Sequence, residues 1–143
     1  MSVATKRVYE KPVRSDGARV LVDRLWPRGL RKEAALVHAW LKGLAPSDVL
    51  CRWLRGQPER WQDFRKRYLK ELAHPDASSE LEALYQLVHT RKRVTLVFAS
   101  KDKDHNNAVV LKELLDGMRK PPSSSGSGAA LSMRRRQRAR SPQ

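Results

Sequence analysis

The sequence predicts an α/β fold, a single domain with a small, mainly parallel sheet and helices in the order β-β-α-α-α-β-α. Two observations carry this prediction. Segments 19–25 and 94–100 are short runs rich in Val and Leu, which are typical of buried strands. Between them, apolar residues recur every three or four positions, as in amphipathic helices. A chain of 143 residues, 40% of them hydrophobic, suffices for one core of this kind.

Three segments are predicted strands: 6–10 (KRVYE), 19–25 (RVLVDRL) and 94–100 (VTLVFAS). Pro, Asp and Gly between the first two suit a turn. The third is an apolar run between charged flanks, which favours a strand covered on both faces. Because the crossover from 19–25 to 94–100 is long and helical, we expect these two strands to be parallel neighbours.

The helical stretch begins with a short helix that ends at Trp40 and Leu41. A second helix opens at the Pro-Ser-Asp of residues 46–48, and Pro58 suits the first turn of a third. The third helix has an apolar stripe at helical spacing, formed by Trp61, Phe64, Tyr68 and Leu72. This stripe is more typical of a core than of a ligand cage.

Two further helices follow. Ser79 and Glu82 match a capping box that would start the first, with Leu81, Leu84, Tyr85 and Val88 facing inward. The last helix, after segment 94–100, has a stripe of Ala108, Leu111, Leu115 and Met118 and is expected to end near Gly117.

We assign residues 1–120 to the domain and 121–143 to a basic tail. The tail is rich in Pro, Ser and Gly, so its composition predicts disorder. Its arginine cluster resembles a nucleic-acid-binding or nuclear-localisation segment, and the alternative is an extension without function.

The chain is strongly basic. Its 30 Lys and Arg against 15 Asp and Glu give a formal charge of +15, and without the five tail arginines residues 1–120 keep +10. Such a field attracts anions, from nucleotides to nucleic acids. The sequence has no apolar run of membrane-spanning length and no secretory signal pattern, and the lone Cys51 permits no internal disulfide. We therefore expect a cytoplasmic protein without a membrane partner.

Polar residues follow two of the predicted strands directly, as DRLWPRG after Val22 and SKDKDHNN after Ala99. Ligands in open α/β sheets tend to bind beyond the carboxyl ends of strands, so these segments are expected to meet in a site. The expected ligand-binding residues are Arg24, Trp26, Arg28, Lys101, Asp102 and Asn106, and the expected catalytic residues are Asp23 and His105. Unpaired amides at the start of the last helix would favour a phosphate or carboxylate.

Each of these residues has a structural alternative. Asp23 is either a catalytic carboxylate or the buried partner of Arg24 or Arg28. His105 either transfers protons or caps the last helix together with Asn106.

Trp26 and Cys51 also have two interpretations. Trp26 is either a packing residue or a platform for stacking, in a backbone restricted by Pro27 and turned by Gly29. Cys51 has arginines nearby that would lower a thiol pKa, but a small packed residue is the favoured interpretation.

The sequence lacks the glycine-rich phosphate loops, the nucleophile elbow and the paired-cysteine motif of the common nucleotide, hydrolase and redox families. Its four histidines are scattered without metal-ligand spacing. We therefore expect no metal and no cofactor.

These segments resemble the domain of unknown function 488 family, its short bacterial branch in particular. The resemblance runs from about Lys6 to Leu115 and includes KRVYEKP, VLVDRLWPRGL, RWLRGQPERW and VTLVFASKDKDHNNAVVLKELL. It implies a single cytoplasmic α/β domain whose activity is not settled. The V-D-R-x-W-P-R-G pattern of the family matches throughout, but a histidine that usually precedes Ala108 is Asn107 here. If that histidine is an acid or base in the family, this chain either uses His105 or lacks the step.

The leading hypothesis is a protein that binds a small phosphate-bearing anion at the strand ends, with hydrolase or transferase activity left open. The alternative is a noncatalytic nucleic-acid-binding protein, and a third is a partner-binding domain without a site. A hollow that gathers Asp23, Arg28 and Lys101 would favour the first, and a broad basic face would favour the second.

Overall fold

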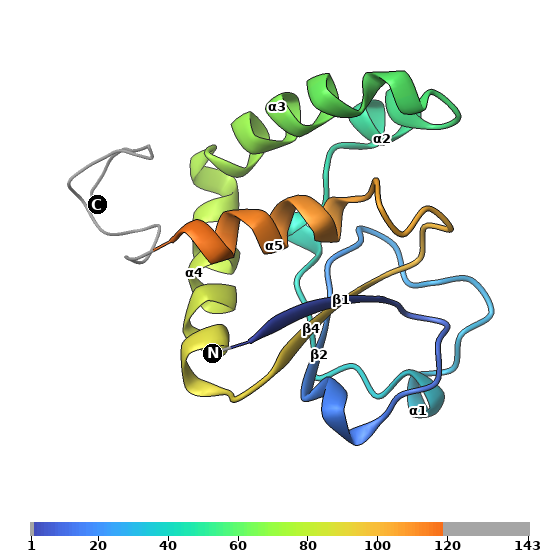
Figure 1. The fold of residues 1–143 in the computed structure, drawn as a ribbon, viewed down its shortest axis with the longest axis vertical. Helices are drawn as coiled ribbons and strands as arrows, with labels where there is room; N and C mark the ends of the chain where they lie inside the picture. The colour runs from blue at the N-terminus through green and yellow to red at the C-terminus, as the bar shows by residue number, and fades with distance from the viewer. Residues whose placement is uncertain (1, 119–143) are drawn as a thin grey trace.

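A computed structural model describes residues 2–118, which form a small sheet with helices (Figure 1). The sheet has the strand order β1-β4-β2-β3, and every pairing is parallel. The strands are β1 (Val3–Arg7), β2 (Ala18–Leu21), β3 (Ala39–Trp40) and β4 (Val94–Phe98). The α/β fold is therefore confirmed. The predicted tail, 121–143, lies outside the described residues.

The expected neighbours β2 and β4 are indeed adjacent and parallel, with Val20 opposite Leu96. The predicted strands end later than the observed ones. β1 covers Val3–Arg7 rather than 6–10, because Glu10 turns back to Arg7 through both its backbone amide and its carboxylate. β2 and β4 stop at Leu21 and Phe98, before the polar residues that follow them.

The predicted short helix ending at Trp40 and Leu41 is wrong. Helix α1 (Lys32–Ala35) ends well before them, and Ala39–Trp40 pair with β2 as the edge strand β3. The amides of His38 and Leu41 donate to β2 carbonyls on either side of this pair. A two-residue strand is too short to show a period in the sequence, so this element was not predictable.

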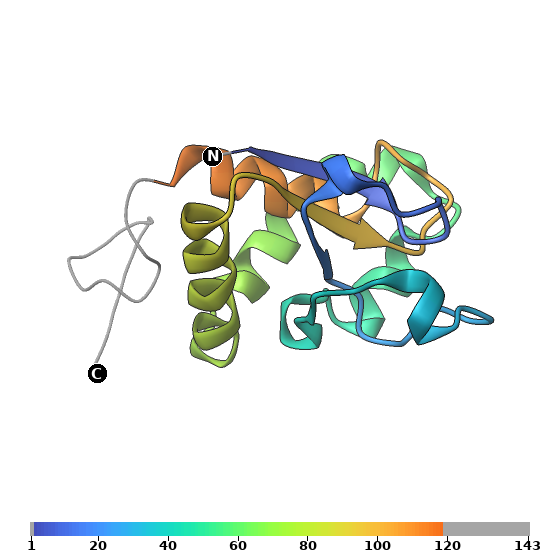
Figure 2. The same ribbon diagram turned by 90° about the horizontal axis from the view of Figure 1, so that it is seen from below.

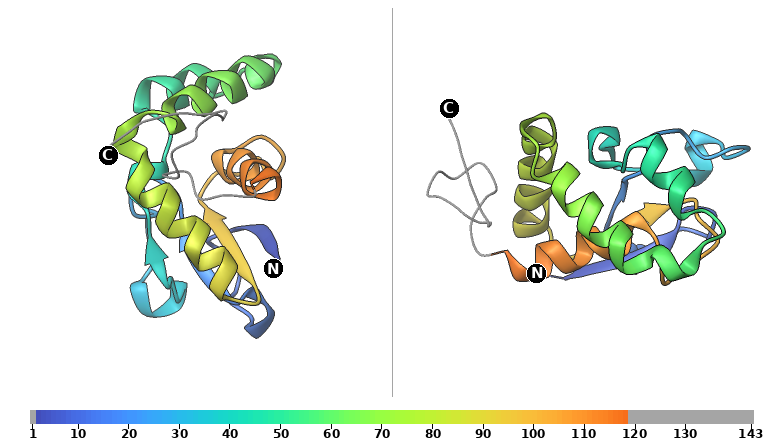
Figure 3. Two further views of the ribbon diagram at one scale, coloured as in Figure 1. Left: turned by 90° about the vertical axis from the view of Figure 1, so that its left-hand side faces the viewer. Right: turned by 90° about the horizontal axis from the view of Figure 1, so that it is seen from above.

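Helices α2 (Asp48–Leu54), α3 (Trp61–Leu72), α4 (Pro75–Thr90) and α5 (Asn107–Gly117) form the rest of the fold, with short 3₁₀ turns at η1 (Arg14–Asp16), η2 (Lys42–Leu44) and η3 (Pro58–Arg60). The capping box at Ser79 and Glu82 is wrong, because α4 already starts at Pro75, where the His74 ring accepts a bond from the Asp76 amide. In Figure 3, α3 and α4 meet at a corner with α5 beside them.

The two faces of the sheet are covered differently. One face contributes Val20, Leu96 and Phe98 to the main core, together with the predicted inward residues of α3 and α5 and with Leu81, Leu84 and Val88 of α4. Tyr85 is also buried but lies outside this cluster, with its ring 4.1 Å from that of His89. On the other face a smaller cluster of Val8, Leu21 and Val97 packs under loops. Figure 2 shows α1 and its loops at the far side of the molecule from α4. Among the described residues, no helix is long and apolar enough to span a membrane.

Candidate functional site

The loops after β2 and β4 meet at the carboxyl edge of the sheet, as the sequence predicts, and Asp23 joins them. One oxygen of its carboxylate accepts a bond from the Ala99 amide at 2.8 Å, and the other accepts from the Asn107 side chain at 3.1 Å. The same amide group of Asn107 donates to the Val22 carbonyl at 2.8 Å. Asp23 thus ties the end of β2 to the end of β4 and to the start of α5.

The carboxylate of Asp23 has neutral partners. Burial raises the pKa of Asp23 above its ordinary value, and the bonds from Ala99 and Asn107 only partly oppose this effect. Neither Arg24 nor Arg28 is among the partners that the structure gives Asp23 within residues 2–118. The prediction that Asp23 is the buried partner of Arg24 or Arg28 is therefore wrong.

The loop after β1 joins the same edge. The Arg7 guanidinium donates to the carbonyls of Ser100 at 2.9 Å and Ala99 at 3.1 Å. The Tyr9 hydroxyl donates to the Arg28 carbonyl at 2.9 Å, and the Arg7 guanidinium lies 5.1 Å from the Tyr9 ring centroid. The sequence interpretation did not include Arg7 and Tyr9. The predicted strand 6–10 places Arg7 inside the strand, whereas the observed β1 ends at Arg7, so the pattern that identified Asp23 gave no signal for Arg7.

The three predicted cations have different roles in the structure. The Arg24 guanidinium donates to the Pro46 carbonyl at 3.0 Å, which directs it toward the loop before α2. The side chains of Arg28 and Lys101 are exposed, and the structure gives them no protein partner among the described residues. Arg28 and Lys101 are therefore the cations that this edge leaves available to a ligand.

Trp26 and Gly29 shape the loop that carries Arg28. The Trp26 ring packs edge-on against Trp40 at 5.5 Å, and its N–H donates to the Leu30 carbonyl at 2.7 Å. Gly29 has a φ of 75°, a conformation that favours glycine, and closes the turn as expected. These contacts agree with the packing interpretation of Trp26.

The loop before α5 is organised by Asp102. Its carboxylate accepts bonds from the amides of Asp104 and His105 and lies 3.1 Å from the His105 ring nitrogen Nδ1. Burial acts to raise the pKa of Asp102, but these hydrogen bonds outweigh it and hold the pKa below its ordinary value. Asp102 thus occupies the His105 amide, one of the amides expected to be open to an anion.

His105 and Asn106 have separate roles. Asn106 alone caps α5, with its side-chain oxygen accepting from the Val109 amide at 3.1 Å. The His105 ring lies between Asp102 and Trp61, whose ring centroid is 5.0 Å away. Within residues 2–118 the structure gives no contact between His105 and Asp23, so the two predicted catalytic residues face different partners.

Cys51 lies close to the Pro46 carbonyl, at 3.8 Å. Burial is the main cause that raises the pKa of the Cys51 thiol above its ordinary value, and the negative charge of the nearby Asp23 carboxylate adds to it. The Arg24 guanidinium opposes this effect. A raised pKa disfavours the reactive thiolate, which agrees with the packing interpretation. In residues 2–118, no group of three His, Cys, Asp or Glu side chains is placed to hold a metal ion.

A shallow hollow of about 490 Å³, which is more open than enclosed, is lined by Asp63, Lys66, Arg67 and Lys70 on α3. It contains none of Asp23, Arg28 and Lys101. This hollow therefore does not provide the pocket that the leading hypothesis looked for at the strand ends.

Residues 2–128 match the family described as the inactive DUF488-N3 subclade. The uncharacterized protein Rv3073c of Mycobacterium tuberculosis strain H37Rv is 44% identical over 115 residues, covering 80% of this chain and 94% of that protein. The uncharacterized protein YeaO of Escherichia coli K12 is 36% identical over 116 residues, covering 80% of this chain and 97% of that protein. No solved structure matches.

Proposed function

Since the chain belongs to the inactive DUF488-N3 subclade, we propose that it is a noncatalytic cytoplasmic protein that binds a small phosphate-bearing anion at the carboxyl edge of its sheet. This proposal is supported by Arg28 and Lys101, which have no protein partners among the described residues and lie on loops fastened to the sheet, although the hollow on α3 does not include them. Because these loops are held by hydrogen bonds, a ligand would order few further groups on binding.

The contacts of Asp23 are those of a residue that holds the fold together. Both oxygens of Asp23 already accept hydrogen bonds from the protein, one of them from Asn107. An amide cannot exchange protons as an imidazole does, so Asp23 and Asn107 act as a structural clamp in this proposal.

An arginine at position 28 suits a phosphate because its planar guanidinium donates two parallel hydrogen bonds, which lysine cannot copy. The Arg28→Lys substitution keeps the charge and removes this geometry. We expect ligand affinity to fall by about 1–3 kcal/mol, the scale of hydrogen bonds to charged groups. The stability of the fold should change by less than about 0.5 kcal/mol, since the side chain is exposed.

The experiment is a thermal-shift screen of the full chain against inorganic phosphate, sugar phosphates and nucleotides, followed by titration of each hit. A ligand at 100 times its dissociation constant stabilises the native state by about 2.7 kcal/mol, which such a screen detects. Arg14→Lys is the matched control, since Arg14 is exposed and precedes the amino end of β2. If Arg28→Lys loses stability but keeps full ligand affinity, Arg28 is a structural residue and the proposal fails.

A further inference from the structure

The segment that runs from α2 through η3 to α3 carries a concentration of basic residues. Residues 52–70 include Arg52, Arg55, Arg60, Arg65, Lys66, Arg67 and Lys70, against the acids Glu59 and Asp63. α3 lies along one side of the molecule, at the top of Figure 1, with α2 beside its amino end. The segment from α2 to α3 is therefore strongly basic in a chain whose overall charge is also large.

Two arginines of this segment are fixed by an aromatic ring. The guanidinium of Arg67 lies 4.6 Å from the Trp53 ring centroid, and that of Arg60 lies 5.0 Å from it. Arg60 also donates to the Trp53 carbonyl at 2.8 Å. Because Trp53 packs against the core, it holds both guanidinium groups in place and lowers the entropy lost when they bind an anion.

The hollow on α3 lies next to this pair. Arg67 is one of its lining residues, and Lys66 and Lys70 are two others, one helical turn apart. The structure gives neither lysine a protein partner among the described residues. Other cations of the segment are already engaged, since Arg65 pairs with Glu113 at 2.6 Å and Arg52 with Asp48 at 3.1 Å.

We propose that this face, formed by Arg60, Lys66, Arg67 and Lys70 around Trp53, binds the phosphate backbone of a nucleic acid. The cations are spread along a helix instead of converging on one point, so they match a repeated anion better than a single small one. Lys66 and Lys70 are about 6 Å apart along the helix axis, which lets each contact its own phosphate. This inference does not depend on the proposed strand-end ligand.

A membrane surface fits the face less well. Peripheral binding to lipid combines basic residues with apolar side chains that enter the bilayer. The exposed large apolar side chains of the described residues are Tyr9, Val13, Leu25, Leu36 and Val49. α3 carries none of these, and of the five only Val49 lies on α2, so the face offers charge with little apolar surface to enter a bilayer.

The test is fluorescence anisotropy of the full chain with a labelled single-stranded oligonucleotide and the matching duplex, over a range of salt concentrations. The variant is Lys66→Gln with Lys70→Gln. The control is Arg14→Gln with Lys32→Gln, which removes the same charge from exposed positions near η1 and α1, at the opposite end of Figure 1 from α3. Every protein keeps residues 119–143, so their contribution is common to all measurements.

We expect the variant to bind at least about tenfold more weakly than the control. The slope of log affinity against log salt should fall by about 1.4 for the single strand and about 1.8 for the duplex, because two phosphate contacts are lost. Equal slopes for variant and control would overturn the proposal, since a diffuse field would then explain the binding. Absence of oligonucleotide binding by the parent chain would also overturn it. So would a result in which the Lys66→Gln, Lys70→Gln variant binds an acidic peptide or anionic vesicles more weakly but binds nucleic acid as before.

Discussion

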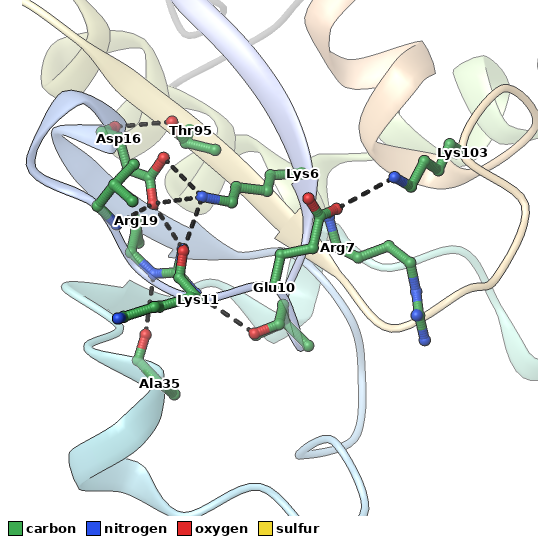
Figure 4. Close-up of polar contacts among 11 residues, drawn as sticks. Lys6, Arg7, Glu10, Lys11, Asp16, Arg19, Ala35, Thr95 and Lys103 are labelled. Carbon is green, nitrogen blue, oxygen red and sulfur yellow. Dashed lines mark hydrogen bonds and ion pairs between the residues drawn. The ribbon is translucent and has the colours of Figure 1, made fainter.

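The two ends of β2 each carry an aspartate, and the two carboxylates are held in opposite ways. Asp16, before the strand, lies 2.9 Å from the Arg19 guanidinium and 3.1 Å from the Lys6 ammonium. Figure 4 shows these side chains gathered around the Asp16 carboxylate. Asp23, after the strand, accepts from the neutral donors Ala99 and Asn107, and the described residues 2–118 give its carboxylate no cationic partner. Cations favour the charged form of a carboxylate, whereas burial among neutral groups disfavours it. The amino end is thus a closed ionic cluster. At the carboxyl end Arg7 and Arg24 donate to backbone carbonyls, and the exposed Arg28 and Lys101 have no protein partner among the described residues.

The cluster at the amino end joins several elements. Arg19, which is 3% exposed, also donates to the Ala35 carbonyl at 2.9 Å. The hydroxyl of Thr95 on β4 donates to the Asp16 carbonyl at 2.7 Å. Gly17 permits the tight turn between them, because its φ is 65° and a Cβ there would lie 2.2 Å from the Arg93 carbonyl oxygen. These contacts therefore stabilise the amino end of the sheet.

The largest effect is expected from Arg19→Met. The substitution keeps an apolar stem but leaves the buried Asp16 carboxylate without its closest cation. Breaking a buried ion pair from one side costs about 3–5 kcal/mol, which urea unfolding would measure. Arg14→Met, an exposed change in the same segment, should stay within about 0.5 kcal/mol. Equal losses in the two variants would mean that the cluster contributes no special stability.

The next largest effect is expected from Asn107→Ala at the other end. The variant loses the bonds to Asp23 and to the Val22 carbonyl, leaving buried acceptors unsatisfied at a cost of about 1–3 kcal/mol. The free energy of urea unfolding measures this loss. Asn106→Ala removes the α5 cap and should cost about 1 kcal/mol. A smaller loss for Asn107→Ala than for Asn106→Ala would contradict the clamp between β2 and α5.

The contrast also explains what the sequence could predict. The carboxyl edge was predictable, because DRLWPRG and SKDKDHNN each follow an apolar run and parallel strands end at a common edge. The inward faces of α3 and α4 followed from helical period, as Phe64 and Leu84 show. The strand β3 and the start of α4 could not be predicted from the sequence, because a two-residue strand and a histidine cap carry little local signal.

The partners of polar residues were the least predictable feature. Arg19 is a charged residue in a strand that reads as apolar, and its burial follows from Asp16 and Lys6, which the fold brings from other elements. Likewise, Asp23 lies beside two arginines in the chain but accepts from Ala99 and Asn107. Sequence neighbours at a sharp turn point in different directions, so pairing depends on tertiary contacts that no local pattern encodes.

The smallest expected effect is in the pH dependence of stability, where the two aspartates should differ in sign. Burial acts to raise the pKa of Asp16, but the hydrogen bonds from Val13, Lys6 and Arg19 hold it below 3.8. Its contribution is therefore complete above about pH 3.8 and is lost as the pH falls through the lower folded-state pKa. The pKa of Asp23 is raised above 3.8, mainly by burial, so its carboxyl group favours the folded state at low pH. That contribution is lost as the pH rises above about 3.8 toward the folded-state pKa.

Urea unfolding of the parent chain, Asp16→Asn and Asp23→Asn between about pH 2.5 and pH 7 separates the two contributions. The stability of the parent chain relative to Asp16→Asn should decrease as the pH falls below about 3.8. Relative to Asp23→Asn, it should instead increase as the pH falls toward 3.8, since an amide at position 23 does not titrate. If both stability differences change in the same direction with pH, the neutral donors at the carboxyl end stabilise the charged carboxylate as Lys6 and Arg19 do. The contrast between the two ends of β2 would then be wrong.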